Sequence, residues 1–145
     1  MVLGENKEVE RMRKIKCRGL VIEPLASGEK WITSYEEYHE VYLNYAECSA
    51  YINGHAVVWE SVSEYTGLKD KNGKEIYEGD IVQQNYKDVY NQNQAFVGEV
   101  VYSDCVYWLK NDDDYTFLYD EHRIYNSIVI GNIYENPELL GGAGE

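Results

Sequence analysis

Short apolar segments separated by sharp turn signals are the feature that most limits how this chain can fold. The clearest turn is Asn53-Gly54, which stands between the apolar segments Tyr51-Ile52 and His55–Trp59. An Asn-Gly pair suits a two-residue type I′ hairpin, because both central residues must adopt positive φ. Asn72-Gly73 marks a second tight reversal farther along the chain. These signals predict a fold built mainly from antiparallel strands.

Other segments carry the same strand pattern. Residues 15–18 alternate between apolar and basic side chains, as a half-buried strand does. Residues 96–102 and 105–109 predict a third hairpin around Ser103-Asp104. Residues 86–94 show no apolar period and predict a mobile loop. Further strands are expected at residues 20–22, 76–77, 81–82, 115–119 and 127–133.

The predicted fold class is mainly β, with one short α-helix in the N-terminal half. The C-terminal half carries about five of the strands, which suits a small barrel of the SH3 type, because curling a sheet hides its edges. The expected parts are a flexible extension, an N-terminal β/α subdomain, an SH3-like β-barrel subdomain and a tail, at residues 1–11, 12–61, 62–140 and 141–145.

The helix is expected from Ser34 to Glu47. Ser34 with Glu37 fits a capping box, in which each side chain bonds the other residue's free backbone N–H. Four tyrosines then recur at helical spacing, on one face: Tyr35, Tyr38, Tyr42 and Tyr45. Such a stripe either packs on the sheet with its hydroxyls at the edge, or forms an exposed face that binds a partner.

The charge of the chain excludes one class of partner. The chain has 145 residues, with 13 Lys and Arg against 26 Asp and Glu, and a net charge of −13. Direct binding to duplex DNA is not expected, because that affinity comes mainly from cations that neutralise phosphates. Residues 31–66 carry 6 anions and no Lys or Arg, and residues 88–145 have a net charge of −9. Most of the acidity thus belongs to two segments, while residues 1–30 are slightly basic.

Cysteines and hydropathy indicate the compartment. Cys17, Cys48 and Cys105 are odd in number and widely spaced, which predicts reduced thiols rather than disulfides or a zinc site. The sequence contains no run of about 18 apolar residues, so no membrane span is expected. No secretory signal is expected either. We therefore expect a protein of the cytoplasm.

Motifs for catalysis are missing. His39, His55 and His122 have no partner at metal-ligand spacing, and no phosphate-binding glycine motif occurs. His122 lies in the charged run 120–123, where a carboxylate could orient it as a base, although a surface ion cluster explains it as well. Asp112–Asp114 lacks the glycine and distal Glu of a calcium loop. The sequence predicts no enzyme and no cofactor or metal.

Two blocks resemble a known family. The longer runs from Tyr65 to Val82 and the shorter from Ile130 to Leu140, and Arg13–Lys16 accompanies them. Together they resemble the YopX family of phage and prophage proteins. The resemblance implies an intracellular protein from a phage-derived genome region, with an SH3-like barrel in its C-terminal half. It implies no activity, because the family is uncharacterised. Residues 35–50 depart from the pattern.

The blocks can also be interpreted physically. Asp80 stands before a strand and is expected to cap a turn through its carboxylate. Asn132 and Asn136 are expected to do the same in Asx-turns. Both blocks can therefore be structural, although either of them could line a shared binding surface.

Four functions stay open. The favoured one is a non-catalytic module that binds a host or phage protein, with aromatic anchors and a rim of carboxylates. The alternative is an acidic DNA mimic that inhibits a host nucleic-acid-binding protein. A small enzyme with an unrecognised site is a third. The fourth is a binder of single-stranded DNA that uses Lys14, Lys16 and Arg18. Unpaired strand edges also allow a homo-oligomer.

Overall fold

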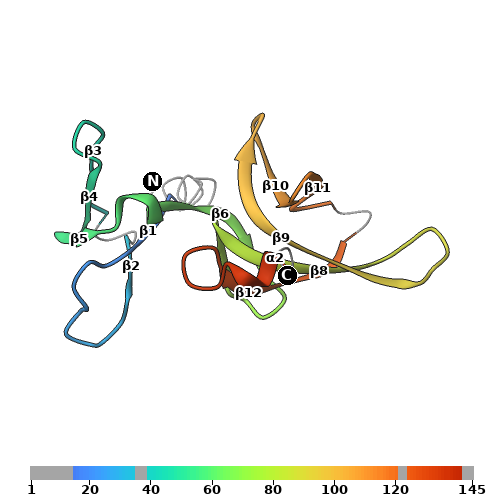
Figure 1. Cartoon of the computed structure of the whole chain (residues 1–145). Coiled ribbons are helices and arrows are strands. Elements are labelled where there is room, and N and C mark those ends of the chain that lie inside the picture. Colours follow the sequence, from blue (N-terminus) through green and yellow to red (C-terminus); the bar gives the residue numbers. More distant parts are fainter. Residues whose placement is uncertain (1–14, 35–38, 121–123, 142–145) are drawn as a thin grey trace, which may run out of the picture. The chain divides into compact units, whose positions relative to one another are not determined.

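The computed structural model describes residues 15–34, 39–120 and 124–141 (Figure 1). Most of these residues form β-strands, so the predicted mainly β class is confirmed. The chain divides between Gly67 and Leu68 into two compact units. The predicted extension at residues 1–11 lies outside the described residues, as does the predicted tail apart from Gly141.

The first unit is built from short strands. The strands are β1 (Cys17–Leu20), β2 (Trp31–Thr33), β3 (Val41–Asn44), β4 (Ser49–Ile52), β5 (His55–Val57) and most of β6 (Ser63–Lys69). A 3₁₀-helix, η1 (Trp59–Ser61), lies between β5 and β6. β1 pairs with β2 and β6, while β3, β4 and β5 form a three-stranded sheet. Backbone bonds from Ile22 to Ala56 and from Val58 to Leu20 join β5 to the chain around β1. The buried core consists of Val21, Ala50, Ile52 and Val57.

The Asn53-Gly54 hairpin is confirmed. The two residues have φ of 47° and 83° and connect β4 to β5. These are the positive values that a type I′ turn needs. The Asn53 side-chain oxygen accepts the Glu40 N–H at 3.0 Å, and the Asn53 N–H donates to the Glu40 carbonyl. The turn therefore also holds the residue that leads into β3.

The helix predicted from Ser34 to Glu47 is wrong over residues 41–44, which form β3. In the pairing of β3 with β4, Tyr42 lies opposite Tyr51. This pairing satisfies backbone groups of β3 and brings Val41 against the core. Long-range pairing and burial of this kind override a local helical pattern, because propensity is a weak preference.

Ser34 does not begin a helix as expected. It is fully buried, its hydroxyl accepts the Cys17 N–H at 2.9 Å, and its own N–H donates to the Cys17 carbonyl at 2.8 Å. The hydroxyl thus extends the pairing of β1 with β2. Glu37, the other half of the predicted capping box, lies outside the described residues. The α-helix that the described ranges contain is α2 (Glu138–Gly141), in the second unit.

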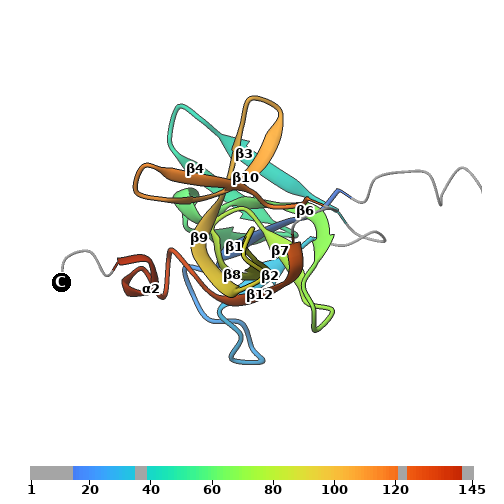
Figure 2. The same ribbon diagram turned by 90° about the vertical axis from the view of Figure 1, so that its right-hand side faces the viewer.

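The second unit is a sheet of longer strands. They are β7 (Glu75–Tyr77), β8 (Asp80–Lys87), β9 (Asn93–Ser103), β10 (Val106–Asn111), β11 (Asp114–Phe117) and β12 (Ile124–Asn132). Five of them form an antiparallel sheet in the order β11-β10-β9-β8-β12. This sheet curls into a half-barrel, and Figure 2 shows the curve through β9, β8 and β12. Its buried core consists of Ile76, Val82, Val100, Leu109 and Leu118.

The loop expected at residues 86–94 is wrong at both ends. Tyr86 pairs with Gln94, and Lys87 with Asn93, so β8 and β9 continue almost to the turn. The Asp88 carboxylate closes the turn by accepting N–H groups of Tyr90 and Gln92, at 2.8 and 3.0 Å. The polar side chains at the two ends of this segment therefore belong to strands, and residues 88–92 form the turn between them. Their lack of an apolar period reflects exposure to solvent rather than irregular backbone.

The hairpin expected around Ser103-Asp104 is confirmed, with its turn one residue later. Asp104 and Cys105 have φ of 54° and 65° and connect β9 to β10. Tyr102 lies opposite Tyr107 on the two strands, and their ring centroids are 4.9 Å apart.

The turn caps predicted for Asp80 and Asn132 in the family-like blocks are confirmed. Asp80 is 1% exposed, and its carboxylate accepts the Tyr77 N–H at 2.8 Å. The Asn132 side-chain oxygen accepts the N–H groups of Tyr134 and Glu135 at 3.0 and 2.9 Å. The Asn136 side-chain oxygen instead reaches back four residues to accept the Asn132 N–H at 3.2 Å, so it holds this turn without forming the expected Asx-turn. These side chains hold the turns around β8 and after β12, which is a structural role.

Asp70 links two parts of the second unit. Its carboxylate accepts the N–H groups of Asn72 and Lys74 within the turn before β7, each at 2.9 Å. It also accepts the Val129 N–H of β12 at 3.0 Å. Burial raises the pKa of Asp70, but these backbone bonds outweigh burial and hold the pKa below its ordinary value. The buried carboxylate is therefore a stabilising anion rather than a proton donor.

Candidate functional site

The described residues contain few clusters of side chains that could bind a metal or carry out catalysis. Across residues 15–34, 39–120 and 124–141, no group of three or more His, Cys, Asp or Glu side chains could hold a metal ion. His39 and His55 are exposed, and His122 lies outside the described residues. No helix in the described ranges is long and apolar enough to cross a bilayer. The features of the described residues that could bind a partner are therefore exposed apolar and polar surfaces.

The first unit carries two pairs of aromatic rings on or beside its three-stranded sheet. The rings of Tyr42 and Tyr51 face each other across β3 and β4, with centroids 6.2 Å apart. The ring of Tyr45 meets that of Trp59 edge-on at 5.1 Å. Tyr42, Tyr45 and Tyr51 are 55%, 74% and 44% exposed, so these rings present broad surface to solvent. We call these four side chains the aromatic face.

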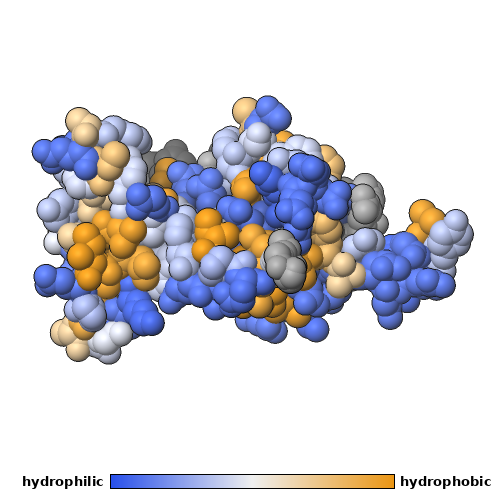
Figure 3. All heavy atoms as spheres, viewed as in Figure 1, coloured by the Kyte–Doolittle hydropathy of each residue, from blue (hydrophilic) through white to orange (hydrophobic). Residues whose placement is uncertain are grey.

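A shallow hollow connects the two ring pairs. Tyr51 and Trp59 both line it, and its volume is about 280 Å³. Its other walls include the exposed Ile22 and the half-buried Val58. Figure 3 shows an apolar area around β5 in this unit. The aromatic face is thus continuous with aliphatic surface, which is the composition of a protein-binding patch.

Carboxylates border the aromatic face, and the stretch of chain that carries them has no Lys or Arg. Glu40, Glu47 and Glu60 are all exposed and lie next to β3, β4 and η1. The described cations that flank this stretch along the chain are Lys30 and Lys69, while Lys16 and Arg18 lie directly before β1 and on it. The Arg18 guanidinium lies 4.6 Å from the Trp31 ring, and the Lys16 ammonium 5.4 Å from the Tyr65 ring. Those cations therefore already have aromatic partners within the unit.

Two of the four tyrosines in the predicted stripe lie in the aromatic face. Tyr42 and Tyr45 both belong to the aromatic face, but on and after a strand rather than on a helix. Tyr35 and Tyr38 lie outside the described residues. Sequence reasoning missed Tyr51 and Trp59, because their proximity depends on the register of β3 with β4 and on the path after β5. The hairpin signal at Asn53-Gly54 could have placed Tyr51, had residues 41–44 been assigned to a strand.

A second exposed aromatic cluster lies on β10 and β11 of the second unit. The Trp108 ring stacks on the Phe117 ring with centroids 4.7 Å apart and meets the Tyr115 ring edge-on at 6.2 Å. The Trp108 indole N–H donates to the Ser103 carbonyl at 2.9 Å, and the Lys110 ammonium lies 5.7 Å from the Tyr115 ring. These internal contacts hold the rings in place and use part of their binding capacity.

The sequence matches the model of a known protein family. The sequence model described as YopX protein matches residues 7–141, which is nearly the whole chain. A search of curated proteins finds no match. The resemblance carried by the two blocks is thereby confirmed, and the chain belongs to the YopX family.

Proposed function

We propose that this protein is a non-catalytic interaction module whose aromatic face binds a basic segment of another protein. The observation that supports this most directly is the pairing of exposed aromatic rings with carboxylates in a stretch that has no Lys or Arg, residues 31–66. Family membership supports the further proposal of a phage-type protein that acts on a host or phage protein in the bacterial cytoplasm. The curl of the five-stranded sheet supports an SH3-like barrel in the second unit.

The aromatic face has the properties of an interaction hot spot. Tyr and Trp bury large area at a small cost in side-chain entropy, and truncating such an anchor in an interface often costs about 2 kcal/mol or more. The edge-on packing of Tyr45 on Trp59 limits the freedom of both rings before a partner arrives. Less ordering is then required on binding, which favours affinity.

The carboxylates select the charge of the partner. Exposed anions attract a basic segment over distances of about one Debye length and raise the association rate. Once docked, Lys or Arg side chains can lie on the Tyr and Trp rings as cation–π contacts. Apolar side chains of the same segment can enter the hollow between Tyr51 and Trp59. A basic segment with interspersed apolar residues is therefore the preferred ligand.

Selection from a displayed library of random peptides tests this proposal with a defined probe. The whole protein should enrich peptides rich in Lys, Arg and apolar residues. The double variant Tyr45→Ala/Tyr51→Ala should lose binding of the selected peptides by at least about tenfold, which corresponds to about 1.4 kcal/mol. Tyr90→Ala is the matched control, because Tyr90 is an exposed tyrosine of the second unit with no part in the aromatic face.

Two outcomes would contradict the proposal. One is a set of selected peptides without basic residues, and the other is equal binding by the double variant and the wild type. The DNA-mimic alternative predicts a different result. A basic nucleic-acid-binding protein would then bind in competition with duplex DNA, would dissociate steeply as salt rises, and would not respond to loss of the two tyrosines.

A further inference from the structure

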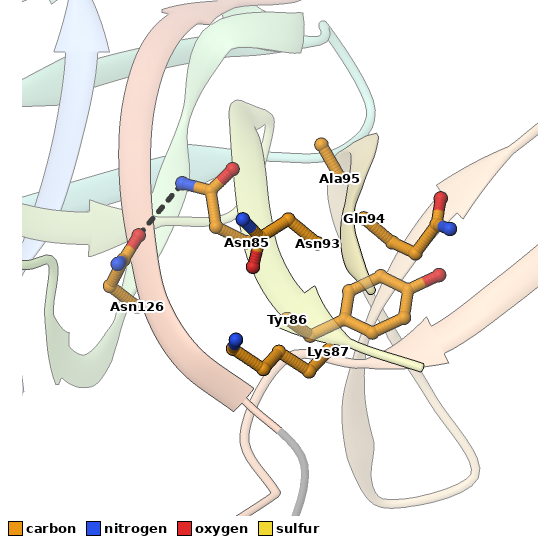
Figure 4. Close-up of a pocket in the computed structure, with 7 residues that line it drawn as sticks. All are labelled: Asn85, Tyr86, Lys87, Asn93, Gln94, Ala95 and Asn126. Atoms are coloured by element: carbon orange, nitrogen blue, oxygen red, sulfur yellow. Dashed lines mark hydrogen bonds between the residues drawn. The ribbon is translucent and has the colours of Figure 1, made fainter. Parts of the chain in front are cut away.

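A polar pocket lies in the second unit, on one face of the sheet where β8, β9 and β12 run side by side. Its volume is about 560 Å³, within the range of small-molecule sites. Figure 4 shows Lys87 and Asn93 between Asn126 on one side and Tyr86 on the other. The residues that line it are Asn85, Tyr86, Lys87, Asn93, Gln94, Ala95 and Asn126. We call this the amide pocket.

Strand register explains why Asn85, Lys87, Asn93 and Asn126 share one face of the sheet, while Tyr86 and Gln94, which pair with each other, project to the opposite face. Asn85 and Lys87 are two residues apart on β8, so they point to the same side of the sheet. Asn93 lies opposite Lys87 on β9, and Asn126 lies opposite Asn85 on β12. Directly opposite residues of antiparallel strands project to the same face. Three strands thus contribute amide groups to a single surface.

Hydrogen bonds within the pocket orient two of its amides. The Gln83 amide donates to the Asn85 oxygen at 3.0 Å, and the Asn85 amide donates to the Asn126 oxygen at 2.8 Å. Because the oxygen of Asn126 accepts this hydrogen bond, its NH₂ group points away from the Asn85 amide. Among the described residues, that NH₂ group, the Asn93 amide and the Lys87 ammonium have no hydrogen-bonding or ion-pairing side chain as partner. The pocket therefore offers several free donors together with free carbonyl oxygens.

The charge around the pocket favours a neutral ligand. Lys87 is its cationic lining residue, and the acidic Asp88 follows Lys87 directly. Residues 88–145 have a net charge of −9, which repels phosphates and other anions. The lining is also rich in side-chain amides, each of which presents a donor and an acceptor side by side. Neighbouring hydroxyl groups, each able to donate and accept, match that arrangement.

We propose that the amide pocket binds a neutral carbohydrate. The amides of Asn93 and Asn126 hold adjacent hydroxyls, and the Lys87 ammonium donates to a third oxygen. Ala95, which lies opposite Asn85 on β9, and the methylene groups of Lys87 provide apolar wall area for the C–H faces of the sugar ring. This site is separate from the aromatic face in residues and in ligand chemistry, so either proposal can fail without the other.

A titration followed by NMR tests the proposal on the full-length protein labelled with ¹⁵N. The probes are maltose, cellobiose and N,N′-diacetylchitobiose, with AMP and inorganic phosphate as anionic comparators. At least one disaccharide should shift the side-chain NH₂ signals of Asn93 and Asn126 saturably, with a Kd of about 1 mM or tighter. The comparators should leave these signals unchanged.

Substitutions locate the binding. Asn93→Ala and Lys87→Ala change exposed side chains, so the fold should persist, and each should weaken the disaccharide at least about fivefold. Asn72→Ala, an exposed asparagine outside the pocket, should leave the affinity unchanged. The proposal is overturned if no disaccharide gives saturable shifts up to about 20 mM. Saturable shifts with phosphate or AMP alone, or equal weakening by Asn72→Ala, would overturn it as well.

Discussion

The two units stabilise their sheets with different polar groups. In the first unit, strands of three to seven residues are completed by buried serine hydroxyls, such as Ser34 and Ser61, that accept backbone N–H groups. In the second unit, strands of up to 11 residues are held at their turns by the buried carboxylates Asp70 and Asp80. Hydroxyl caps bring no titratable group to the first unit, while the Asp70 carboxylate, whose pKa lies below its ordinary value, makes the second unit sensitive to acid.

The two blocks that first indicated the family are divided unevenly between the units. The two family-like blocks lie almost entirely in the second unit, where their Asp and Asn side chains hold turns. Residues 35–50, which were expected to depart from the family pattern, lie inside the matched range and contribute Tyr42 and Tyr45 to the aromatic face of the first unit. The family match spans residues 7–141 and therefore covers both units, while the turn-holding side chains of the two blocks lie in the second unit.

The largest effect is expected for Asp70→Ala. It removes a buried acceptor from the N–H groups of Val129, Lys74 and Asn72 and should reduce the free energy of unfolding by about 3 kcal/mol. Urea unfolding followed by the amide signals of the second unit measures this loss. Asp88→Ala is the matched control, because Asp88 caps a similar turn through exposed bonds and should cost much less. Equal losses for both variants would contradict the structural role of burial here.

Gly19→Ala should have the next largest effect, in the first unit. A Cβ atom at Gly19 would lie 2.8 Å from Cβ of Val57, which is too close for either backbone to remain in place. Overpacking of this kind costs about 2 kcal/mol. The double variant Gly19→Ala/Val57→Ala should lose less than the sum of the single variants, because the second change makes room for the first. Additive losses in urea unfolding would show that the contact does not limit the packing.

Acid should weaken the second unit before the first. The resolved carboxylate pKa shifts among the described residues, at Asp70, Asp88 and Glu99, all belong to the second unit. Because the pKa of Asp70 lies below its ordinary value of 3.8, its stabilising contribution is complete above that pH and is lost as pH falls further. Urea unfolding at a series of pH values, read separately from each unit, measures this. The stability difference between wild type and Asp70→Asn should shrink toward low pH.

Glu99 should show the opposite sign. Burial raises its pKa, and the charge of Lys110 offsets this only in part. A raised pKa means that the folded unit loses stability as pH rises through it. Glu99→Gln should therefore stabilise the second unit slightly at neutral pH and have no effect in acid. A loss of stability at neutral pH would indicate that the carboxylate serves in a favourable ion pair instead.

The smallest effect on stability is expected for Tyr45→Ala. Tyr45 is 74% exposed and makes one edge-on contact with Trp59, so its removal should cost about 0.5 kcal/mol. The same change should strongly reduce peptide binding if the proposed function is correct. Thermal unfolding together with peptide titration separates the two effects. A large loss of stability would place Tyr45 in the framework of the unit rather than in its binding surface.

Local chemistry predicted the turns well. The positive φ at Asn53 and Gly54 follows from the residue types alone, since Asn and Gly tolerate that backbone conformation. The capping roles of Asp80 and Asn132 follow from short carboxylate and amide side chains that reach the backbone two or three residues away. These interactions lie within a few residues, so the sequence carries the whole signal for them.

Segments whose partners lie far along the chain were predicted less well. The spacing of Tyr42 and Tyr45 fits one face of a helix, yet strand β4 recruits residues 41–44 into a sheet. Residues 86–94 lack an apolar period, yet β8 and β9 pair through them. In both cases the deciding energy is hydrogen bonding to another strand, which a local pattern does not contain.

The sequence by itself determined the mainly β class, the main hairpin turns and membership of the YopX family, because turn chemistry and motif residues act locally. The tertiary structure alone decided that Tyr51 and Trp59 join Tyr42 and Tyr45, and that amides from β8, β9 and β12 form one pocket. Both surfaces depend on strand register, and a shift of register by one residue would send alternate side chains to the other face.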